Sequence, residues 1–332
     1  MADIARAAGV SVATVSRSLS SDATAVREET RRRVVWAAER LGYLPNRAAQ
    51  SMRTGSSRLI GLVVADIENP FFASVFRGVE QVATSLGMSV ALFNTDEDPS
   101  RERACLQVIA AERPAGLIVA STNGCDPELL ALRDLGIPMV AIDRRLNAFD
   151  CDTVLLDNEA AAFDATTHLI GLGHRRIAMV SGPRSASTAI ERESGYRRAF
   201  AAAGLEQDQR LVARGDFREA TAVALARQLL DDLEPTAFFG VNNLTTFGIL
   251  RALREAGRRV PADVSIVGFD DPNVGRLVDP PLTAIAQPTS ELGRAAAEML
   301  FRRKAEPQSP PAHVLLAADL IVRGSTMRPL GR

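Results

Sequence analysis

The chain has 332 residues, which is long enough for about two domains, and its 46% hydrophobic and 24% charged residues are ordinary for a soluble globular protein. It shows neither the charged and apolar regions of a secretory signal peptide nor an apolar run long enough for a membrane span. The net charge of −1 hides an asymmetry, because residues 1–58 carry ten Arg against five Asp or Glu (+5) and the remainder carries 29 basic against 35 acidic residues (−6). This predicts a polyanionic partner for the basic front segment alone; a merely solvated helix face is the alternative.

The three cysteines, Cys105, Cys125 and Cys151, are odd in number and follow neither a metal-binding nor a redox spacing. Reduced thiols in a cytoplasmic protein are therefore expected.

The first elements are two short helices that meet at a tight turn. Ile4, Ala5 and Ala8 form one apolar edge at helical spacing, and Gly9 tolerates the positive φ of a turn. The small Ala5 side chain allows a close helix crossing, which is typical of a helix-turn-helix. We expect Val10 and Val15 to fill the angle between the helices.

The second helix, from residue 11 to residue 19, has the properties of a DNA-reading helix. Ser11 is predicted to cap it, which leaves a positive helix N-terminus suited to a phosphate. Its exposed face would carry Val12, Ala13, Ser16 and Arg17. Arg17 is the first candidate for base recognition, because a guanidinium can grip O6 and N7 of guanine, whereas Val12 and Ala13 offer only apolar contact.

Residues 5–17, A-R-A-A-G-V-S-x-x-T-V-S-R, resemble the DNA-reading motif of the lactose/galactose repressor (LacI/GalR) family, and the resemblance continues through nearly the whole chain. It implies a cytoplasmic, ligand-responsive transcription factor, most often a repressor, that binds a pseudo-palindromic double-stranded DNA operator as a homodimer. Family members usually carry a Thr cap ahead of the residue that matches Asp3, whereas this chain begins two residues before it. We expect either a start further upstream or a frayed first helix. The DNA contacts implied within this motif are Ser11, Val12, Ala13, Thr14, Ser16 and Arg17.

A third helix is predicted from residue 28 to residue 41, where Val34 and Ala38 recur at helical spacing and Gly42 can end the helix. It would complete a small DNA-binding head. Trp36 is predicted to pack in its core. The run of Arg31, Arg32 and Arg33 either touches phosphates or is solvated.

Residues 46–57 form a connecting segment. Asn46 can cap a seven-residue stretch, RAAQSMR, which is too short to be a stable helix alone, since isolated helices below about 12 residues are marginal. The resemblance implies a hinge helix that orders on DNA, with Met52 as the apolar minor-groove wedge. A flexible linker is the alternative. The DNA contacts implied here are Asn46, Arg47, Ala49 and Met52.

From residue 59 onward, short and almost entirely apolar runs alternate with amphipathic helical stretches such as 72–86, 159–172, 218–230 and 245–256. This pattern predicts parallel sheets covered on both faces, and about nine units favour two doubly wound lobes, like a periplasmic binding protein, over one sheet. The fold class is therefore α/β with a small all-α head. The predicted domains are 1–45 (head), 46–57 (hinge) and 58–332 (effector binding and dimerisation). Lobe one takes about 58–158 and 288–316, and lobe two about 159–287 and 317–332.

Ligands of open α/β sheets bind beyond the carboxyl ends of the strands, so the residues just after each apolar run are candidates for a site between the lobes. Their carboxylates, amides, guanidinium groups and flat rings suit a polyol such as a sugar. The resemblance implies six of them as effector contacts: Phe72, Asp143, Arg192, Phe217, Asn242 and Asp270. Further candidates of the same kind are Asp66, Asn69, Phe71, Arg144, Asn243 and Asp271. Taken singly, each of these residues could instead be a helix cap or a core ring.

Arg144 and Arg192 roughly balance Asp66, Asp143 and Asp270, which favours a neutral sugar over a strongly anionic metabolite. His168, His174 and His313 lack partners at catalytic spacing, and neither a nucleotide-binding motif nor a metal-ligand cluster is found, so we expect neither enzyme activity nor a cofactor nor a metal. The alternatives are a solute-binding protein for sugar transport, an α/β enzyme acting on a sugar and a non-specific nucleoid protein.

Overall fold

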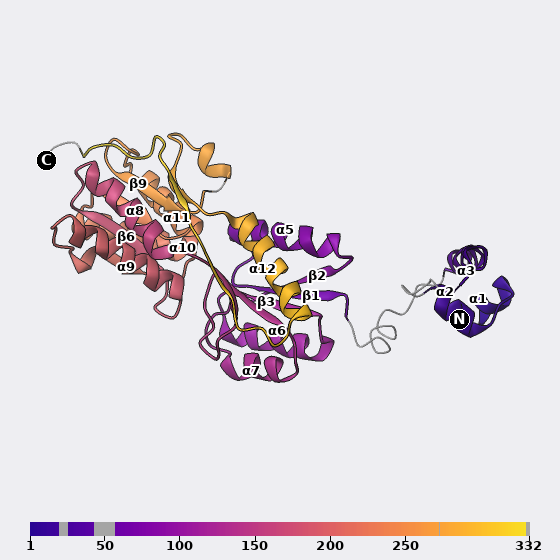
Figure 1. The fold of residues 1–332 in the computed structure, drawn as a ribbon. Helices are drawn as coiled ribbons and strands as arrows, with labels where there is room; N and C mark the ends of the chain where they lie inside the picture. The colour runs from indigo at the N-terminus through magenta and orange to yellow at the C-terminus, as the bar shows by residue number, and fades with distance from the viewer. Residues whose placement is uncertain (20–25, 43–56, 272, 330–332) are drawn as a thin grey trace. The chain divides into compact units, whose positions relative to one another are not determined.

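The structure is a computed structural model that describes residues 1–19, 26–42, 57–271 and 273–329. The chain divides into two compact units, Met1–Ser57 and Arg58–Arg332, which are described separately (Figure 1). In the described part, no helix is both long and apolar enough to cross a bilayer.

The first unit contains the helices α1 (Ala2–Ala8), α2 (Val12–Ser18) and α3 (Glu28–Arg40). Gly9 ends α1 in the left-handed conformation with φ 64°, as the turn requires. The predicted apolar edge of α1 is buried, and Val15 of α2 is fully buried against Val34 of α3. These contacts form a small core of their own, which the structure completes with Ala37 and Ala38.

The prediction that Trp36 packs in this core is wrong, because its side chain is 57% exposed. The core face of α3 runs through Val34, Ala37 and Ala38, and Trp36 lies two residues after Val34, which is about 200° around the helix. The Arg40 guanidinium covers the Trp36 ring instead, with Cζ 5.0 Å from the ring centroid.

Lobe one of the second unit is a six-stranded parallel sheet in the order β11-β5-β4-β3-β1-β2. Its strands are β1 (Leu59–Val64), β2 (Ser89–Asn94), β3 (Gly116–Val119), β4 (Met139–Ile142), β5 (Asp152–Leu156) and β11 (His313–Leu316). Ile60 and Leu62 face α5 (Pro70–Ser85) and α12 (Thr289–Ala305), while Val63 faces α6 (Pro99–Glu112) and α7 (Asp126–Asp134). Both faces of β1 are therefore buried, which explains its continuous apolar run.

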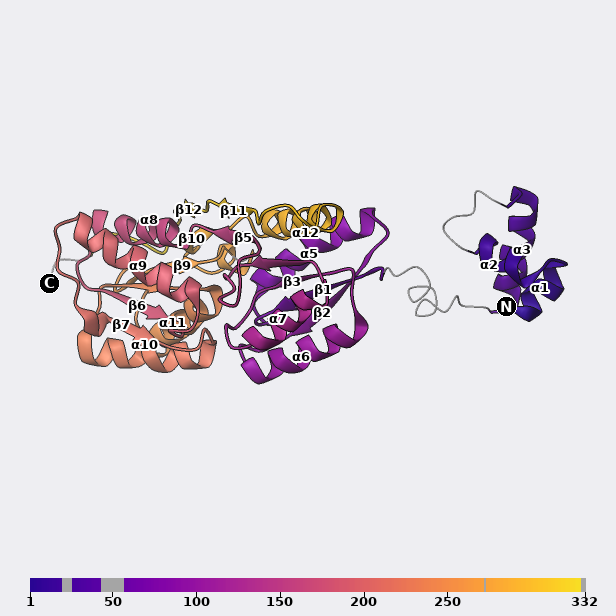
Figure 2. The same cartoon turned by 60° about the horizontal axis from the view of Figure 1, so that its bottom comes forward.

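Lobe two has the strand order β12-β10-β9-β8-β6-β7. Its strands are β6 (Ile177–Ser181), β7 (Val212–Arg214), β8 (Ala237–Gly240), β9 (Ser265–Phe269), β10 (Thr283–Ala286) and β12 (Asp319–Ile321). Helices α8 (Asn158–Gly171) and α9 (Ser187–Ala202) cover one face, and α10 (Glu219–Leu233) and α11 (Asn243–Glu255) the other (Figure 2). The short 3-10 turns η2 (Gln209–Leu211) and η3 (Asn273–Arg276) complete the lobe. Two doubly wound α/β lobes are thus confirmed.

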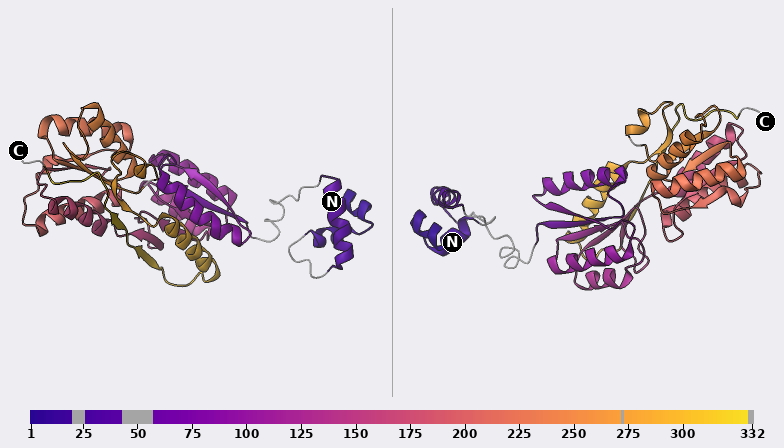
Figure 3. Two further views of the ribbon diagram at one scale, coloured as in Figure 1. Left: turned by 90° about the horizontal axis from the view of Figure 1, so that it is seen from above. Right: turned by 180° about the vertical axis from the view of Figure 1, so that it is seen from behind.

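The chain passes between the lobes three times: from β5 to α8, from β10 to α12 and from β11 to β12 (Figure 3). The last passage takes only two residues, so β12 begins at the end of the second sheet that faces lobe one and runs away from lobe one. For this reason β12 pairs antiparallel with β10, whereas the other described pairings of both sheets are parallel. These three short passages place the carboxyl ends of the other strands of the two sheets on either side of one cleft.

Candidate DNA-reading head and effector cleft

The α2 helix of the head begins as predicted. The Ser11 hydroxyl accepts a hydrogen bond from the backbone N–H of Thr14 at 3.1 Å, so the predicted cap is confirmed. Val12 is 48% exposed, and Ala13 and Arg17 are exposed as well, while Ser16 is half-buried. The Arg17 Nε lies 3.4 Å from the Ala13 carbonyl oxygen, so the guanidinium extends along the outer face of the helix. A protruding, capped helix with an arginine on its exposed face is what major-groove recognition requires.

The other candidates for DNA contact, the arginine run of α3 and the hinge segment, belong to parts of the chain outside α2. Arg33 donates from Nη2 to the carbonyl oxygen of Ala8 and so joins α3 to the end of α1, which makes it part of the fold of the head. Arg32 forms an exposed ion pair with Glu28. The predicted hinge helix and its four predicted DNA contacts, Asn46, Arg47, Ala49 and Met52, lie outside the described residues.

The cleft of the second unit lies between the two sheets and is lined from both lobes. All six residues predicted as effector contacts line it. Lobe one contributes Asp66, Asn69, Phe71, Phe72, Glu97, Asp143 and Arg144, and the other side contributes Thr188, Arg192, Phe217, Asn242, Asp270 and Gln287. Their residue types, carboxylate, amide, guanidinium, hydroxyl and aromatic ring, are those that bind a polyol by paired hydrogen bonds and cover its apolar face.

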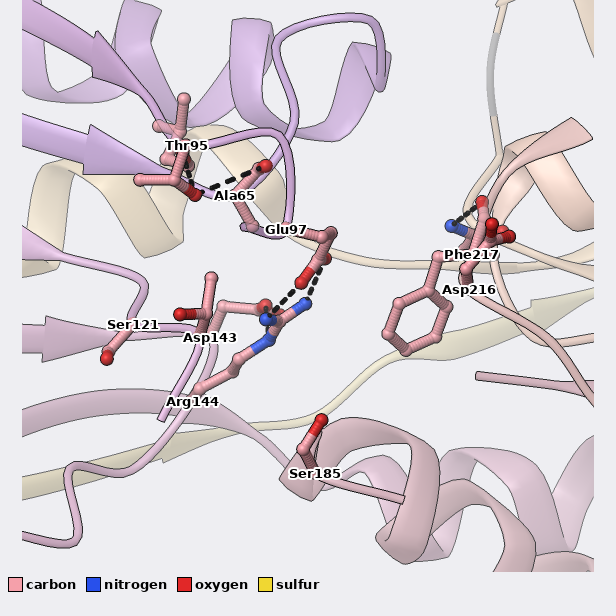
Figure 4. Close-up of polar contacts among 12 residues, drawn as sticks. Ala65, Thr95, Glu97, Ser121, Asp143, Arg144, Ser185, Asp216 and Phe217 are labelled. Carbon is pink, nitrogen blue, oxygen red and sulfur yellow. Dashed lines mark hydrogen bonds and ion pairs between the residues drawn. The ribbon is translucent and has the colours of Figure 1, made fainter. Parts of the chain in front are cut away.

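A buried ion pair forms the lobe-one wall of the cleft (Figure 4). Arg144 donates from Nη1 and Nη2 to the two carboxylate oxygens of Glu97, at 2.7 and 2.5 Å. The Arg144 Cζ lies 5.7 Å from the centroid of the Phe217 ring, which comes from lobe two. The Glu97–Arg144 pair therefore faces the opposite lobe directly.

Asp143 is the next group along this wall. Its carboxylate lies 3.6 Å from Nε of Arg144, which is an ion pair but too long for a hydrogen bond. Burial raises the pKa of Asp143 to about 6, although Arg144 and Arg192 partly oppose this rise. Its oxygens are therefore available as acceptors for a ligand.

On the lobe-two side, a buried arginine is held in place by the protein itself. Arg192 donates from Nε to Asn158 Oδ1 at 2.8 Å and from Nη1 to the Val241 carbonyl at 2.5 Å, and its Cζ lies 3.7 Å from the centroid of the Phe269 ring. Asp270 supplies a facing carboxylate, and burial raises its pKa. The guanidinium orientation is thus fixed by the packing of lobe two.

Asn242 occupies the N-cap of α11 in a reciprocal capping box. Its Oδ1 accepts from the backbone N–H of Thr245 at 2.8 Å, and the Thr245 hydroxyl accepts from the backbone N–H of Asn242 at 3.0 Å. Its Nδ2 donates to the Phe217 carbonyl oxygen at 3.2 Å. Asn242 is therefore a helix cap that also lines the cleft.

Phe217 packs with unusual closeness against the backbone of the strand end at Gly182. A Cβ at Gly182 would lie 2.1 Å from Cε1 of the ring. Phe217 has φ 68°, and six of the eight positive-φ residues other than glycine in the described part lie at the cleft or at the contacts between the lobes. These are Asp96, Glu97, Asn123, Asp143, Phe217 and Asp270. Such conformations cost about 1 to 3 kcal/mol each and cluster where function needs a fixed geometry.

The lobes are in direct contact around the cleft. Asn69 accepts from Asn243 at 3.0 Å, and the Asp96 carbonyl oxygen accepts from Arg218 Nη2 at 2.8 Å. The cavity between the lining side chains is small, about 30 Å³, which leaves room for little more than solvent. Entry of a ligand the size of a monosaccharide therefore requires the lobes to separate or the side chains to rearrange.

Two of the residues predicted at strand ends, Asp271 and Asn243, do not line the cleft. Asp271 pairs with Arg323 and Arg276, and Asn243 points to Asn69, so neither lines this cleft. The sequence interpretation also missed Glu97, Thr188 and Gln287 as lining residues. Glu97 follows β2 and Gln287 follows β10, so a more complete application of the strand-end rule would have found both.

The histidines are bound within the fold. His168 and His313 contact Thr326 and Thr153, and His174 contacts Thr236 and the Met327 carbonyl oxygen, all at 2.9 Å. Among the described residues, no group of three or more His, Cys, Asp or Glu side chains is placed to hold a metal ion. The three cysteines are free thiols, and burial raises the pKa of Cys125 and of Cys151 to about 11.

A helix-turn-helix head in one unit and a two-lobed polar cleft in the other define a ligand-responsive DNA-binding regulator. Residues 1–46 match the model of the bacterial regulatory proteins of the lacI family, and residues 166–326 match the periplasmic binding protein-like domain. The chain is 38% identical to the HTH-type transcriptional regulator PtxS of Pseudomonas putida over 98% of this chain and 95% of that protein. The chain belongs to the LacI family.

Two solved structures have the same architecture over nearly the whole chain. The complex of the transcriptional regulator CelR with cellobiose has a TM-score of 0.76 and 34% identity, and covers 97% of this chain and 98% of its own. The lac repressor dimer bound to operator and the anti-inducer ONPF has a TM-score of 0.84 and 28% identity, with 98% of each chain covered. The expected family is thus confirmed, and the chain is a transcriptional regulator.

Proposed function

We propose that this regulator is a repressor that binds a pseudo-palindromic operator as a homodimer and releases or grips it in response to a sugar. One observation supports the effector site above all: residues from both lobes, far apart in the sequence, converge on a single polar cleft with an aromatic wall. The lac repressor dimer on its operator and the CelR–cellobiose complex support the mode of action and the ligand class.

In this proposal, residues 1–45 read DNA, 46–57 form the hinge and 58–332 bind effector and dimerise. Arg17 reads a guanine, and the helix N-terminus at Ser11 contacts a phosphate. Symmetry follows because one three-helix head offers few base contacts, whereas two heads related by a twofold axis read half-sites about one helical turn apart. The hinge contacts, with Met52 as the wedge, stay a prediction. We place the protein in the cytoplasm.

The effector acts by population shift. A ligand that contacts both lobes favours their closed arrangement by its differential affinity, and the lobe arrangement then biases the hinge toward the ordered or the disordered form. Asp143 and Phe72 hold the ligand from lobe one. Arg192, Phe217, Asn242 and Asp270 hold it from lobe two.

Two measurements test this proposal. An operator is first obtained by binding-site selection with the full chain. Arg17→Ala should then abolish discrimination between that operator and random DNA in a gel shift, and retained discrimination would remove Arg17 from base reading. Asp270→Ala or Arg192→Ala should bind the operator like the wild type yet lose the response to a sugar found by thermal shift. An unaltered response would disprove the pocket.

The solute-binding alternative accounts for the two lobes but not for the head, which matches the lacI family model over residues 1–46. The enzyme alternative would require turnover of the bound sugar, and the histidines described above are bound within the fold. Both alternatives are therefore less well supported than the repressor.

A further inference from the structure

The cleft is more acidic than the sequence indicates. The sequence suggests two arginines against three aspartates, and the structure adds Glu97, which follows β2 and lies beside Arg144 in the same cleft (Figure 4). Four carboxylates thus face two guanidinium groups, an excess of two formal negative charges. The carboxylates are those of Asp66, Glu97, Asp143 and Asp270, and the guanidinium groups are those of Arg144 and Arg192.

The charge of Arg144 is already compensated by Glu97. The two side chains are 4% and 16% exposed and meet through two parallel hydrogen bonds, which is the strongest geometry for this pair. An anionic ligand that approached Arg144 would have to compete with Glu97 and would leave a buried carboxylate without its counter-ion. Arg144 is therefore a poor anchor for a carboxylate or a phosphate.

The acceptors that remain are those of the aspartates. Asp143 is 9% exposed, and among the described residues its carboxylate has only the 3.6 Å ion-pair contact with Nε of Arg144. That same Nε is buried and has no hydrogen-bond partner within the described part of the chain, so both groups face the cleft with unused hydrogen-bonding capacity. Arg192 has two of its nitrogens on Asn158 and Val241. A sugar hydroxyl can donate to the aspartate oxygens and accept from the arginine N–H groups, whereas an anion can only accept, so a polyol fits these groups better than an anion does.

We infer that Glu97 makes the cleft selective for uncharged sugars over sugar acids and sugar phosphates of the same size. This inference rests on the proposed function of the cleft as a sugar site. Glu97 acts through its negative charge. It neutralises the positive charge of Arg144, and its own carboxylate has no hydrogen to donate to an anionic ligand.

The test compares matched pairs of ligands on the full chain at pH 7.5 and constant ionic strength by isothermal titration calorimetry. The probes are D-glucose with D-gluconate and D-glucose 6-phosphate, and D-ribose with D-ribose 5-phosphate. For any pair that binds, the uncharged member should bind about tenfold or more tightly than its anionic partner, given the strength of charge interactions in a buried site. A wild-type protein that binds the anionic member as tightly or more tightly overturns the inference.

Three variants separate charge from shape. Glu97→Gln should lower the preference for the uncharged member by about tenfold, since it frees the charge of Arg144. The double variant Glu97→Gln with Arg144→Gln restores the net charge of the wild type and should restore the preference. Arg144→Gln alone leaves the negative charge of Glu97 unpaired and should increase the preference for the uncharged ligand. This variant tests the inference even if Glu97→Gln does not fold.

Glu128→Gln is the matched control, because Glu128 forms a 2.7 Å pair with Arg103 in the same lobe and does not line the cleft. It should leave the ligand preference unchanged. An unchanged ratio in a folded Glu97→Gln protein overturns the role of Glu97 while leaving the sugar site intact. If none of these probes binds the wild type, the sugar found by thermal shift is compared with its own acid or phosphate. If no sugar binds the wild type at all, the sugar class of the proposed function fails instead, and the inference falls with it.

Discussion

Asn69 and Asn243 join the two lobes through a buried side-chain hydrogen bond of 3.0 Å, from Nδ2 of Asn243 to Oδ1 of Asn69. The same Asn69 oxygen accepts the backbone N–H of Phe71 at 2.9 Å and so caps α5. One oxygen atom therefore serves both the start of a lobe-one helix and the contact with α11 of lobe two. Any opening of the cleft at this point must break the bond to Asn243 and can leave the cap in place.

Asn243→Ala should shift the lobes toward the open arrangement. The variant removes the donor but keeps the Asn69 cap of α5. The Asn243 Oδ1 that it also removes has no hydrogen-bond partner among the residues that the structure describes, so the fold should persist. Loss of one net hydrogen bond, about 1 kcal/mol, predicts a roughly fivefold weaker affinity for the sugar that binds the wild type. Calorimetry measures the affinity, and small-angle X-ray scattering measures the radius of gyration.

The control is Asn123→Gly, which removes a longer inter-lobe bond of 3.4 Å to the Ser185 carbonyl oxygen at an exposed edge and tolerates the φ of 63° at this position. It should change the affinity by less than the error. Equal effects of the two variants would contradict the role assigned to Asn243.

Gly182→Ala should displace the Phe217 ring from the cleft. The added Cβ would lie 2.1 and 2.2 Å from two ring atoms, so the ring must move, and such overpacking costs about 1 to 3 kcal/mol. Urea unfolding should show this loss, and the sugar-induced thermal shift should disappear while operator binding persists. Gly171→Ala, where the added Cβ has no neighbour within 4 Å, should keep the response. A Gly182→Ala protein with a wild-type response would show that the ring position does not matter.

Arg33→Ala should destabilise the head. Its guanidinium is bonded to the Ala8 carbonyl oxygen at the end of α1, so its removal should cost about 1 kcal/mol of head stability. Trp36 is the single tryptophan and lies in the head, so its fluorescence reports thermal unfolding of the head in the full chain. Arg31→Ala changes an exposed arginine of the same helix and should alter only the salt dependence of DNA binding. If both variants melt like the wild type, the bond to Ala8 does not stabilise the head.

The stability of lobe two should fall as the pH falls below about 6.5. Burial lowers the pKa of His174 from its ordinary value of 6.5, so below that pH the unfolded chain binds a proton that the folded chain does not. The stabilisation by neutral His174 is therefore complete above pH 6.5 and is lost as the pH drops toward the lowered pKa. Melting temperatures at pH 5.5 and 7.5 should differ less for His174→Gln than for the wild type. Equal differences would contradict this assignment.

Much of this molecule was predictable because its signals are local. The capped α2 helix depends on Ser11 and Thr14, three residues apart, and the strand-end rule needs only an apolar run and the residue after it, as with Asp143 after β4 and Asp270 after β9. The parallel lobes follow from the same runs, since strands buried on both faces have no polar alternation.

Contacts between distant segments could only come from the tertiary structure. Glu97 and Arg144 are 47 positions apart and Asn69 and Asn243 are 174 apart, and neither pair has a spacing rule that predicts it. The exposure of Trp36 likewise depends on which face of α3 meets α1 and α2. Local periodicity in the sequence was enough to determine the all-α head, the two-lobed α/β unit and the candidate residues at the strand ends. The packing of the lobes decided which side chains meet across the cleft, because a charge or an amide finds its partner only when the backbone brings it within a few ångströms.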